Sequence, residues 1–389
     1  MRREVAERLS TALAFGPTGI IWAFLPIHLR FLGASYFLIS LVSLIPAVET
    51  IGLSPLWGGV LDRTGHGNRI LLLSFAAQAA GFSTFPFLTS PGEFVIVVSL
   101  IGLFSSSFVP IYAAIATIAN PQHGSAIGKF WIAASLGYAS VTLVGGLVYQ
   151  YEPVDYLFLL GASYGVLGVI VILFVRKDAL GITKSIERPR GYWGLMKQRN
   201  IAVLCLLSIG ILVSASAFNN YFTVYLVNTL NGSRLTAGLA ATATTMLGAL
   251  GYRFVGPLND RIGRKPVFLL GTAGYAAYYT ILYFVTNIAV VTLLWVLPIY
   301  PLAQSASAAL MSDYTSTADR GKGLGVLESA LSFGGGLGPL AGGLIADAAD
   351  LQAVILFSLA IALVTMISSK LFLREGEVNR TRSLGDSVH

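Results

Sequence analysis

The most regular feature of the sequence is the alternation of long apolar runs with short breaks rich in charged residues, proline or glycine. An α-helix needs about 20 apolar residues to cross the hydrocarbon core of a bilayer. Twelve runs approach or exceed this length, and they lie near residues 9–30, 36–57, 70–88, 94–118, 126–149, 155–175, 201–227, 235–257, 267–285, 288–312, 323–346 and 351–372. The pattern predicts an all-α membrane protein with twelve transmembrane helices, named here spans 1 to 12.

The longest polar stretch separates span 6 from span 7 and divides the spans into two sets of six. We therefore predict an N-terminal six-helix bundle over 1–175, a cytoplasmic linker over 176–199, a C-terminal six-helix bundle over 200–374 and a cytoplasmic tail over 375–389. The first apolar run continues into further spans and lacks an ending typical of a cleavage site, so we do not interpret it as a signal peptide.

Composition excludes a soluble protein. Of the 389 residues, 55% are hydrophobic and only 11% are charged, whereas about a quarter of the residues of a soluble domain are charged. The net charge of +7 comes from basic residues scattered between the apolar runs, so it indicates membrane topology and not a nucleic-acid partner. All Lys and Arg residues except Arg30, Arg234 and Arg253 lie on one side if both termini are cytoplasmic. The positive-inside rule then predicts a multi-pass protein of the cell membrane with both termini in the cytoplasm.

Two charged turns repeat at the same place in each half. In the turn between spans 2 and 3, "GGVLDRTGHGN" carries Gly58, Asp62, Arg63 and Gly65. Between spans 8 and 9, "GPLNDRIGRKP" carries their counterparts 198 residues later, and Arg264 and Lys265 follow: Gly256, Asp260, Arg261, Gly263, Arg264 and Lys265. "VGGLV" at 144–148 is repeated as "AGGLI" at 341–345. Two related halves predict a pseudo-two-fold axis along the membrane normal with a site between the halves.

These features resemble the major facilitator superfamily of secondary transporters, whose signature between helices 2 and 3 runs Gly-x-Leu-x-Asp-Arg-x-Gly-Arg-Lys. The second turn matches throughout, and the first has Val60 for Leu and His66–Gly67 for Arg-Lys. The resemblance covers the whole chain and implies the major facilitator fold. It also implies that each turn acts as a cytoplasmic latch, because an Asp can accept hydrogen bonds at the N-terminus of a helix in the opposite half. A purely topological role for the turns remains the alternative.

Glycines in span 11 predict close helix packing. Gly334, Gly338 and Gly342 recur every four residues and therefore share one helix face, and Pro339 favours a kink. We prefer small-residue packing to a direct transport role. The family's antiporter motif belongs in helix 5, which lacks a proline here, and the arginine motif of its helix 4 is absent. Both departures weaken the case for a drug–proton antiporter.

The resemblance implies that spans 1, 4, 7 and 10 line a central cavity. These spans carry uncharged polar and aromatic residues, which suit a neutral or amphipathic solute. Hydrogen bonding between helices is the alternative role. The cavity candidates are Trp22, Ser106, Tyr112, Asn219, Asn220, Tyr225, Trp295, Tyr300 and Gln304.

Four ionisable residues fall inside the spans, where charge is costly and function is the default hypothesis. Glu49 and Glu328 are proton-coupling candidates, since by family resemblance span 2 faces span 11. The two carboxyls would then meet at a similar depth. Lys129 and Arg253 lie close to the cytoplasmic surface, where they could reach water or Asp260.

We find no motif for ATP binding, metal ligation or nucleophilic catalysis, and we predict neither an enzyme nor a cofactor. The sequence predicts a secondary active transporter that works by alternating access, with proton-coupled export of a neutral or amphipathic organic compound. The alternatives are an uptake symporter or facilitator for sugars or organic acids, and a non-transporting receptor or scaffold. The expected partners are a small-molecule substrate, protons and the lipid bilayer, and we expect a monomer.

Overall fold

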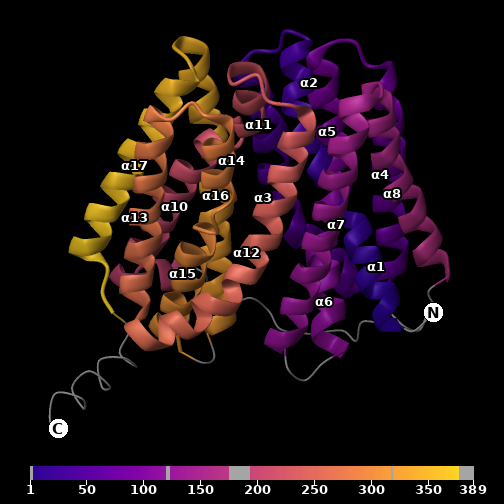
Figure 1. Cartoon of the computed structure of the whole chain (residues 1–389). Helices are drawn as coiled ribbons and strands as arrows, with labels where there is room; N and C mark the ends of the chain where they lie inside the picture. Colours follow the sequence, from indigo (N-terminus) through magenta and orange to yellow (C-terminus); the bar gives the residue numbers. More distant parts are fainter. Residues whose placement is uncertain (1–2, 120–122, 175–192, 317–318, 376–389) are drawn as a thin grey trace, which may run out of the picture. The chain divides into compact units, whose positions relative to one another are not determined.

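The computed structural model describes residues 3–119, 123–174, 193–316 and 319–375, and nearly all of these residues are helical (Figure 1). Most of the predicted linker, 176–192, and most of the tail, 376–389, lie outside the described residues. Each predicted span corresponds to one helix or to a series of helices that follow one another in the chain.

The first six spans are built from eight α-helices and two short irregular helices. Spans 2, 5 and 6 are single helices, and the others are interrupted or end in a different helix type. In chain order the elements are α1 (Arg3–Phe15), η1 (Ile20–Phe24), α2 (Leu25–Phe31), α3 (Tyr36–Thr64), α4 (Gly67–Thr84), η2 (Phe85–Phe87), α5 (Pro91–Ser105), α6 (Phe108–Ala119), α7 (His123–Tyr151) and α8 (Val154–Phe174).

The last six spans follow a short helix, α9 (Trp193–Met196). Spans 8, 9, 11 and 12 are single helices. In chain order the elements are α10 (Arg199–Asn219), α11 (Phe222–Val224), η4 (Tyr225–Thr229), α12 (Arg234–Ile262), α13 (Arg264–Phe284), α14 (Ile288–Val296), α15 (Tyr300–Tyr314), α16 (Arg320–Ala348) and α17 (Leu351–Phe372).

Eleven of the twelve predicted spans are long and apolar enough in the described residues to cross a membrane. The twelfth, span 8, is α12. With 29 residues it is long enough, but threonine and glycine dilute its apolar residues, and Arg253, Asp260 and Arg261 lie near its end. The predicted all-helical membrane fold is confirmed.

The helices pack into two compact units. Unit 1 comprises Met1–Ile186 and Phe222–Met246, and unit 2 comprises Glu187–Tyr221 and Leu247–His389. The start of α12 therefore packs in unit 1, where the hydroxyls of Thr142 and Thr242 are 2.8 Å apart. The Gln150 side chain accepts a hydrogen bond from the backbone N–H of Arg234 at 3.0 Å. The division into bundles of 1–175 and 200–374 stays a prediction.

In unit 2, the glycines of α16 lie directly against α10, as predicted for small-residue packing. A Cβ atom at Gly342 would be 2.3 Å from the Ala217 carbonyl oxygen. One at Gly338 would be 2.8 Å from the Val213 carbonyl oxygen. Because lipid supplies no hydrophobic drive for helix association, close packing of backbones is a main source of stability here.

We expect Gly342→Ala to lower stability by roughly 1–3 kcal/mol, because the added methyl group must push two helix backbones apart. The measurement is thermal unfolding of the purified protein in detergent. Gly335→Ala is the matched control, since a Cβ at this glycine of the same helix meets no atom within 4 Å in the described structure. Equal unfolding temperatures for the two variants would contradict the packing argument.

Candidate functional site

Four spans share a break in the middle, and they are spans 1, 4, 7 and 10. Span 1 turns at Gly16–Pro17 and continues as the π-helix η1, and span 4 turns at Ser106–Ser107 between α5 and α6. Span 7 turns at Asn220–Tyr221, and span 10 is non-helical from Leu297 to Ile299. Broken backbone at membrane depth is tolerated only where it is buried in protein or lines a cavity. The spans that the family resemblance assigns to the cavity are thus the interrupted ones.

The break in span 4 is stabilised by side chains of spans 2 and 3, which satisfy carbonyls at the end of α5. Ser54 donates to the Ser106 carbonyl at 2.9 Å, and the Trp57 indole N–H donates to the Leu103 carbonyl at 3.0 Å. Ser74 reaches the Phe104 carbonyl at 3.0 Å. These bonds replace helical hydrogen bonds that the turn removes, so the break is a fixed feature of unit 1.

The predicted cavity residues of unit 1 occupy two kinds of environment. Ser106, Tyr112 and Tyr225 are buried, and the Tyr112 ring lies 6.3 Å from the Phe130 ring within the hydrophobic core. Trp22 is 55% exposed. Of these four side chains, Trp22 is therefore the exposed one, and its place in a cavity stays a prediction.

In unit 2, the breaks of spans 7 and 10 are joined by a hydrogen bond between predicted cavity residues. The Trp295 indole N–H, near the end of α14, donates to the Asn219 side-chain oxygen at 3.2 Å. Asn220 is the C-terminal cap of α10, and its backbone N–H bonds back to the Ser216 and Phe218 carbonyls. The Asn219 and Asn220 side chains therefore stand at a helix end and not on a regular helix face.

A second polar group in unit 2 surrounds the start of α15. Tyr252 donates a short hydrogen bond to the Gln304 side-chain oxygen, and the Tyr252 and Tyr300 rings meet edge to face with centroids 6.0 Å apart. Sequence reasoning missed Tyr252, because it lies on span 8, outside the four cavity spans. The sequence feature that could have identified Tyr252 is its position directly before Arg253, a charged residue inside a span.

Glu49 lies half-buried on α3 against α5. Its Oε1 accepts a hydrogen bond from the Ser99 hydroxyl at 2.8 Å, while Oε2 is buried without a hydrogen-bond partner in the described structure. Gly102 makes room for the carboxyl group, since a Cβ there would lie 2.0 Å from Oε2. A carboxyl group inside a membrane span thus accepts one hydrogen bond, and its second oxygen accepts none in the described structure.

The other three ionisable residues that the sequence analysis placed inside the spans are exposed. Lys129, Arg253 and Glu328 all have exposed side chains. Glu49 belongs to unit 1 and Glu328 to unit 2, so an approach of the two carboxyl groups stays a prediction. Among the described residues no group of three or more His, Cys, Asp and Glu side chains could hold a metal ion.

Both charged turns depend on glycine in the left-handed region. Gly65 ends α3 with φ of 65°, and Gly263 separates α12 from α13 with φ of 94°, values that side chains disfavour. A Cβ atom at Gly58 or Gly256 would have no neighbouring atom within 4 Å among the described residues, so neither glycine is required for close packing there. Arg63 and Arg261 are exposed, and the side chain of Asp62 lies outside the description.

Arg264 is the residue of the second turn that makes a buried ion pair. Its Nε lies 3.2 Å from Asp313 Oδ2, and the two side chains are 15% and 9% exposed. By contrast Asp260 is 70% exposed and lies 3.9 Å from the Arg264 guanidinium. Glu375 accepts hydrogen bonds from the backbone N–H groups of Arg264 and Lys265 at 2.8 and 3.2 Å. The turn is therefore held to the end of α15 and to the segment after α17.

We expect Asp313→Asn to lower stability by roughly 3 kcal/mol, because it leaves the buried Arg264 guanidinium with only the long contact to the exposed Asp260. Asp260→Asn, the matched control, should change it by less than about 1 kcal/mol, since exposed pairs are weak. Thermal unfolding in detergent measures both. A larger loss for Asp260→Asn would show that the signature acid, and not Asp313, supports the turn.

Comparisons with known proteins agree with this architecture. The sequence profile of the Major Facilitator Superfamily matches residues 9–231 and 204–387. The proton-coupled antiporter flippase LtaA of Staphylococcus saprophyticus is 24% identical over 301 residues, covering 75% of this chain and 73% of the relative. An uncharacterized MFS-type transporter of Methanocaldococcus jannaschii is 23% identical over 376 residues, covering 91% and 93%.

Solved structures show the same fold. The nucleoside transporter NupG superimposes with a TM-score of 0.83 at 14% identity, covering 96% of this chain and 99% of that one. A bacterial homologue of the human lysosomal transporter Spinster, inward-facing and occupied, gives 0.76 at 15% identity, covering 94% and 95%. At such identity the likeness concerns the fold alone. With its profile matched along almost the whole chain and its fold shared with these transporters, the chain belongs to the Major Facilitator Superfamily.

Proposed function

We propose that the chain is a secondary active transporter that exports a neutral or amphipathic organic compound in exchange for protons, by alternating access. The observation that carries this proposal is the setting of Glu49, a half-buried carboxyl group in a membrane span with one oxygen left without a partner. Exchange fits the LtaA relative, which is a proton-coupled antiporter flippase.

The environment of Glu49 suits a group that gains and loses a proton. Ionised carboxylates are costly in a membrane span, and one hydroxyl donor from Ser99 does not compensate for full ionisation. A proton on Oε2 removes the charge and turns the unpaired acceptor into a donor. A change of surroundings during transport that supplies water or another donor would favour release of that proton.

The interrupted spans of unit 2 supply groups for an uncharged cargo. Asn219 offers amide donors, Tyr300 a phenol and Trp295 an aromatic face beside the break of span 7. Such a set combines hydrogen bonds with apolar contact, as in most small-molecule sites. It contains no charge that would require a strongly ionised cargo.

Glu49→Gln mimics the protonated carboxyl, so it should abolish transport driven by an imposed pH gradient while leaving the unfolding temperature within a few degrees. The assay is gradient-driven flux of a panel of compounds in proteoliposomes. Glu152→Gln, which removes an exposed acid between α7 and α8, should transport normally. Full gradient-driven flux in Glu49→Gln would remove this residue as the coupling site.

Trp295→Phe keeps the aromatic ring but removes the N–H that fixes Asn219, and Asn219→Ala removes the amide. Each should weaken binding of the transported compound about 3- to 10-fold, the effect of one hydrogen bond. Asn259→Ala is the control, because this buried amide donates to Ser305 and not to a residue of either break. If Trp295→Phe and Asn219→Ala lower stability and leave affinity unchanged, these groups are structural.

A further inference from the structure

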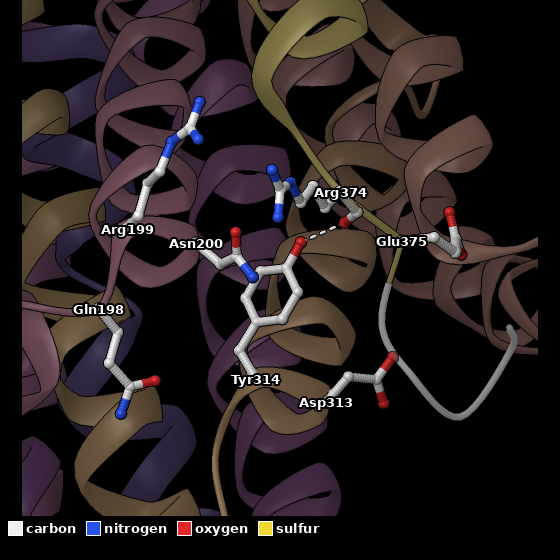
Figure 2. A pocket seen from close by; sticks show the side chains of 7 residues that line it. All are labelled: Gln198, Arg199, Asn200, Asp313, Tyr314, Arg374 and Glu375. Atoms are coloured by element: carbon white, nitrogen blue, oxygen red, sulfur yellow. Dashed lines mark hydrogen bonds between the residues drawn. The ribbon is translucent and has the colours of Figure 1, made fainter.

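Unit 2 contains a pocket of about 380 Å³ that the transport proposal does not use. It lies where three spans end: the start of α10, the end of α15 and the segment after α17 (Figure 2). The lining residues are Gln198, Arg199, Asn200, Asp313, Tyr314, Arg374 and Glu375. Its volume is within the range of small-molecule sites.

The two acids of the pocket already have partners. Asp313 forms the ion pair with Arg264 at 3.2 Å, and Glu375 accepts the backbone N–H groups at the start of α13. In contrast, neither Arg199 nor Arg374 has an acidic partner within 4 Å among the described residues. Backbone N–H groups leave the charge of Glu375 in place, whereas Arg264 balances Asp313. Two arginines against one glutamate leave the lining positive, so the pocket favours an anion.

The pocket also holds the main chain of one of its basic residues in place. The Tyr314 hydroxyl donates a short hydrogen bond to the backbone carbonyl of Arg374, which fixes the main chain that carries this arginine. Figure 2 shows Arg199 and Asn200 on one side of Tyr314 and Arg374 on the other. Guanidinium groups present planar forks of donors that match phosphate oxygens, and amides from Gln198 and Asn200 can add further donors.

The depth of the pocket suits the phosphate layer of a bilayer. Arg199 is the first residue of the span 199–229, Tyr314 is the last of the span 288–314, and Arg374 follows the span that ends at Phe372. These residues therefore mark one edge of the apolar region. The predicted orientation makes this edge cytoplasmic, the leaflet in which anionic lipids attract basic groups.

We propose that this pocket binds a phosphate group through Arg199 and Arg374. The phosphate belongs to the headgroup of an anionic phospholipid or to a soluble phosphate ester, since both present the same oxygens to the two guanidinium groups. The site lies at the ends of spans 7 and 10, away from the breaks at Asn220–Tyr221 and Leu297–Ile299, and it does not depend on the transported compound.

The test uses the purified full chain in a neutral detergent and isothermal titration with two probes, dioctanoyl phosphatidylglycerol and glycerol 3-phosphate. Arg199→Gln and Arg374→Gln should each weaken binding about tenfold or more, the effect expected for a lost charged hydrogen bond. Lys197→Gln is the matched control, because this exposed cation is two residues from Arg199 but does not line the pocket. It should bind like the wild-type protein.

The two probes distinguish the sources of phosphate. Binding of the lipid alone assigns the site to a headgroup, and equal binding of glycerol 3-phosphate assigns it to soluble esters. Arg199→Lys and Arg374→Lys keep the positive charge but lose the planar set of guanidinium donors, so each should weaken binding severalfold. These variants replace the glutamine variants in the test if a glutamine variant unfolds. The proposal is wrong if neither probe binds, or if the double glutamine variant binds as tightly as Lys197→Gln.

Discussion

The constraint on which this structure depends is that backbone N–H and C=O groups need hydrogen-bond partners where water is absent. A continuous helix satisfies them internally, which is why the spans outside the first, fourth, seventh and tenth positions are almost unbroken. An interrupted span exposes several of these groups, each costly in hydrocarbon. Every interruption must therefore be compensated by neighbouring side chains, and those side chains then determine where polar chemistry can exist inside the membrane.

Unit 1 shows how this compensation is made. Ser54, Trp57 and Ser74 donate to carbonyls around the turn that ends α5. Hydroxyl and indole groups that look unremarkable in the sequence thus maintain the break of span 4. The functional consequence is that an amide or a carboxyl group near a break sits in a preformed polar region.

The helical spans were predictable because each depends on a local property, the length of an apolar run. The turns were predictable as well, since Gly65 and Gly263 adopt positive φ values that favour glycine. Residue partners were harder to predict. Asp313 is the buried partner of Arg264, yet it lies at the end of span 10, far from the signature in sequence. Glu375 stood in the predicted tail, where nothing indicated that it would cap α13.

Solvent exposure decides which of the two acids near Arg264 stabilises the second charged turn. An acid and a base four residues apart on a helix and its continuation interact weakly when water can reach them, and Asp260 is 70% exposed. Asp313 is 9% exposed and lies on another helix, so its charge is held against Arg264 with little screening. The Asp260–Arg264 pair of the turn is therefore not what anchors α13 within unit 2. Asp260 remains available for other contacts. The structural partner of Arg264 is Asp313, which lies outside both copies of the repeated turn, so comparing the two copies could not identify it.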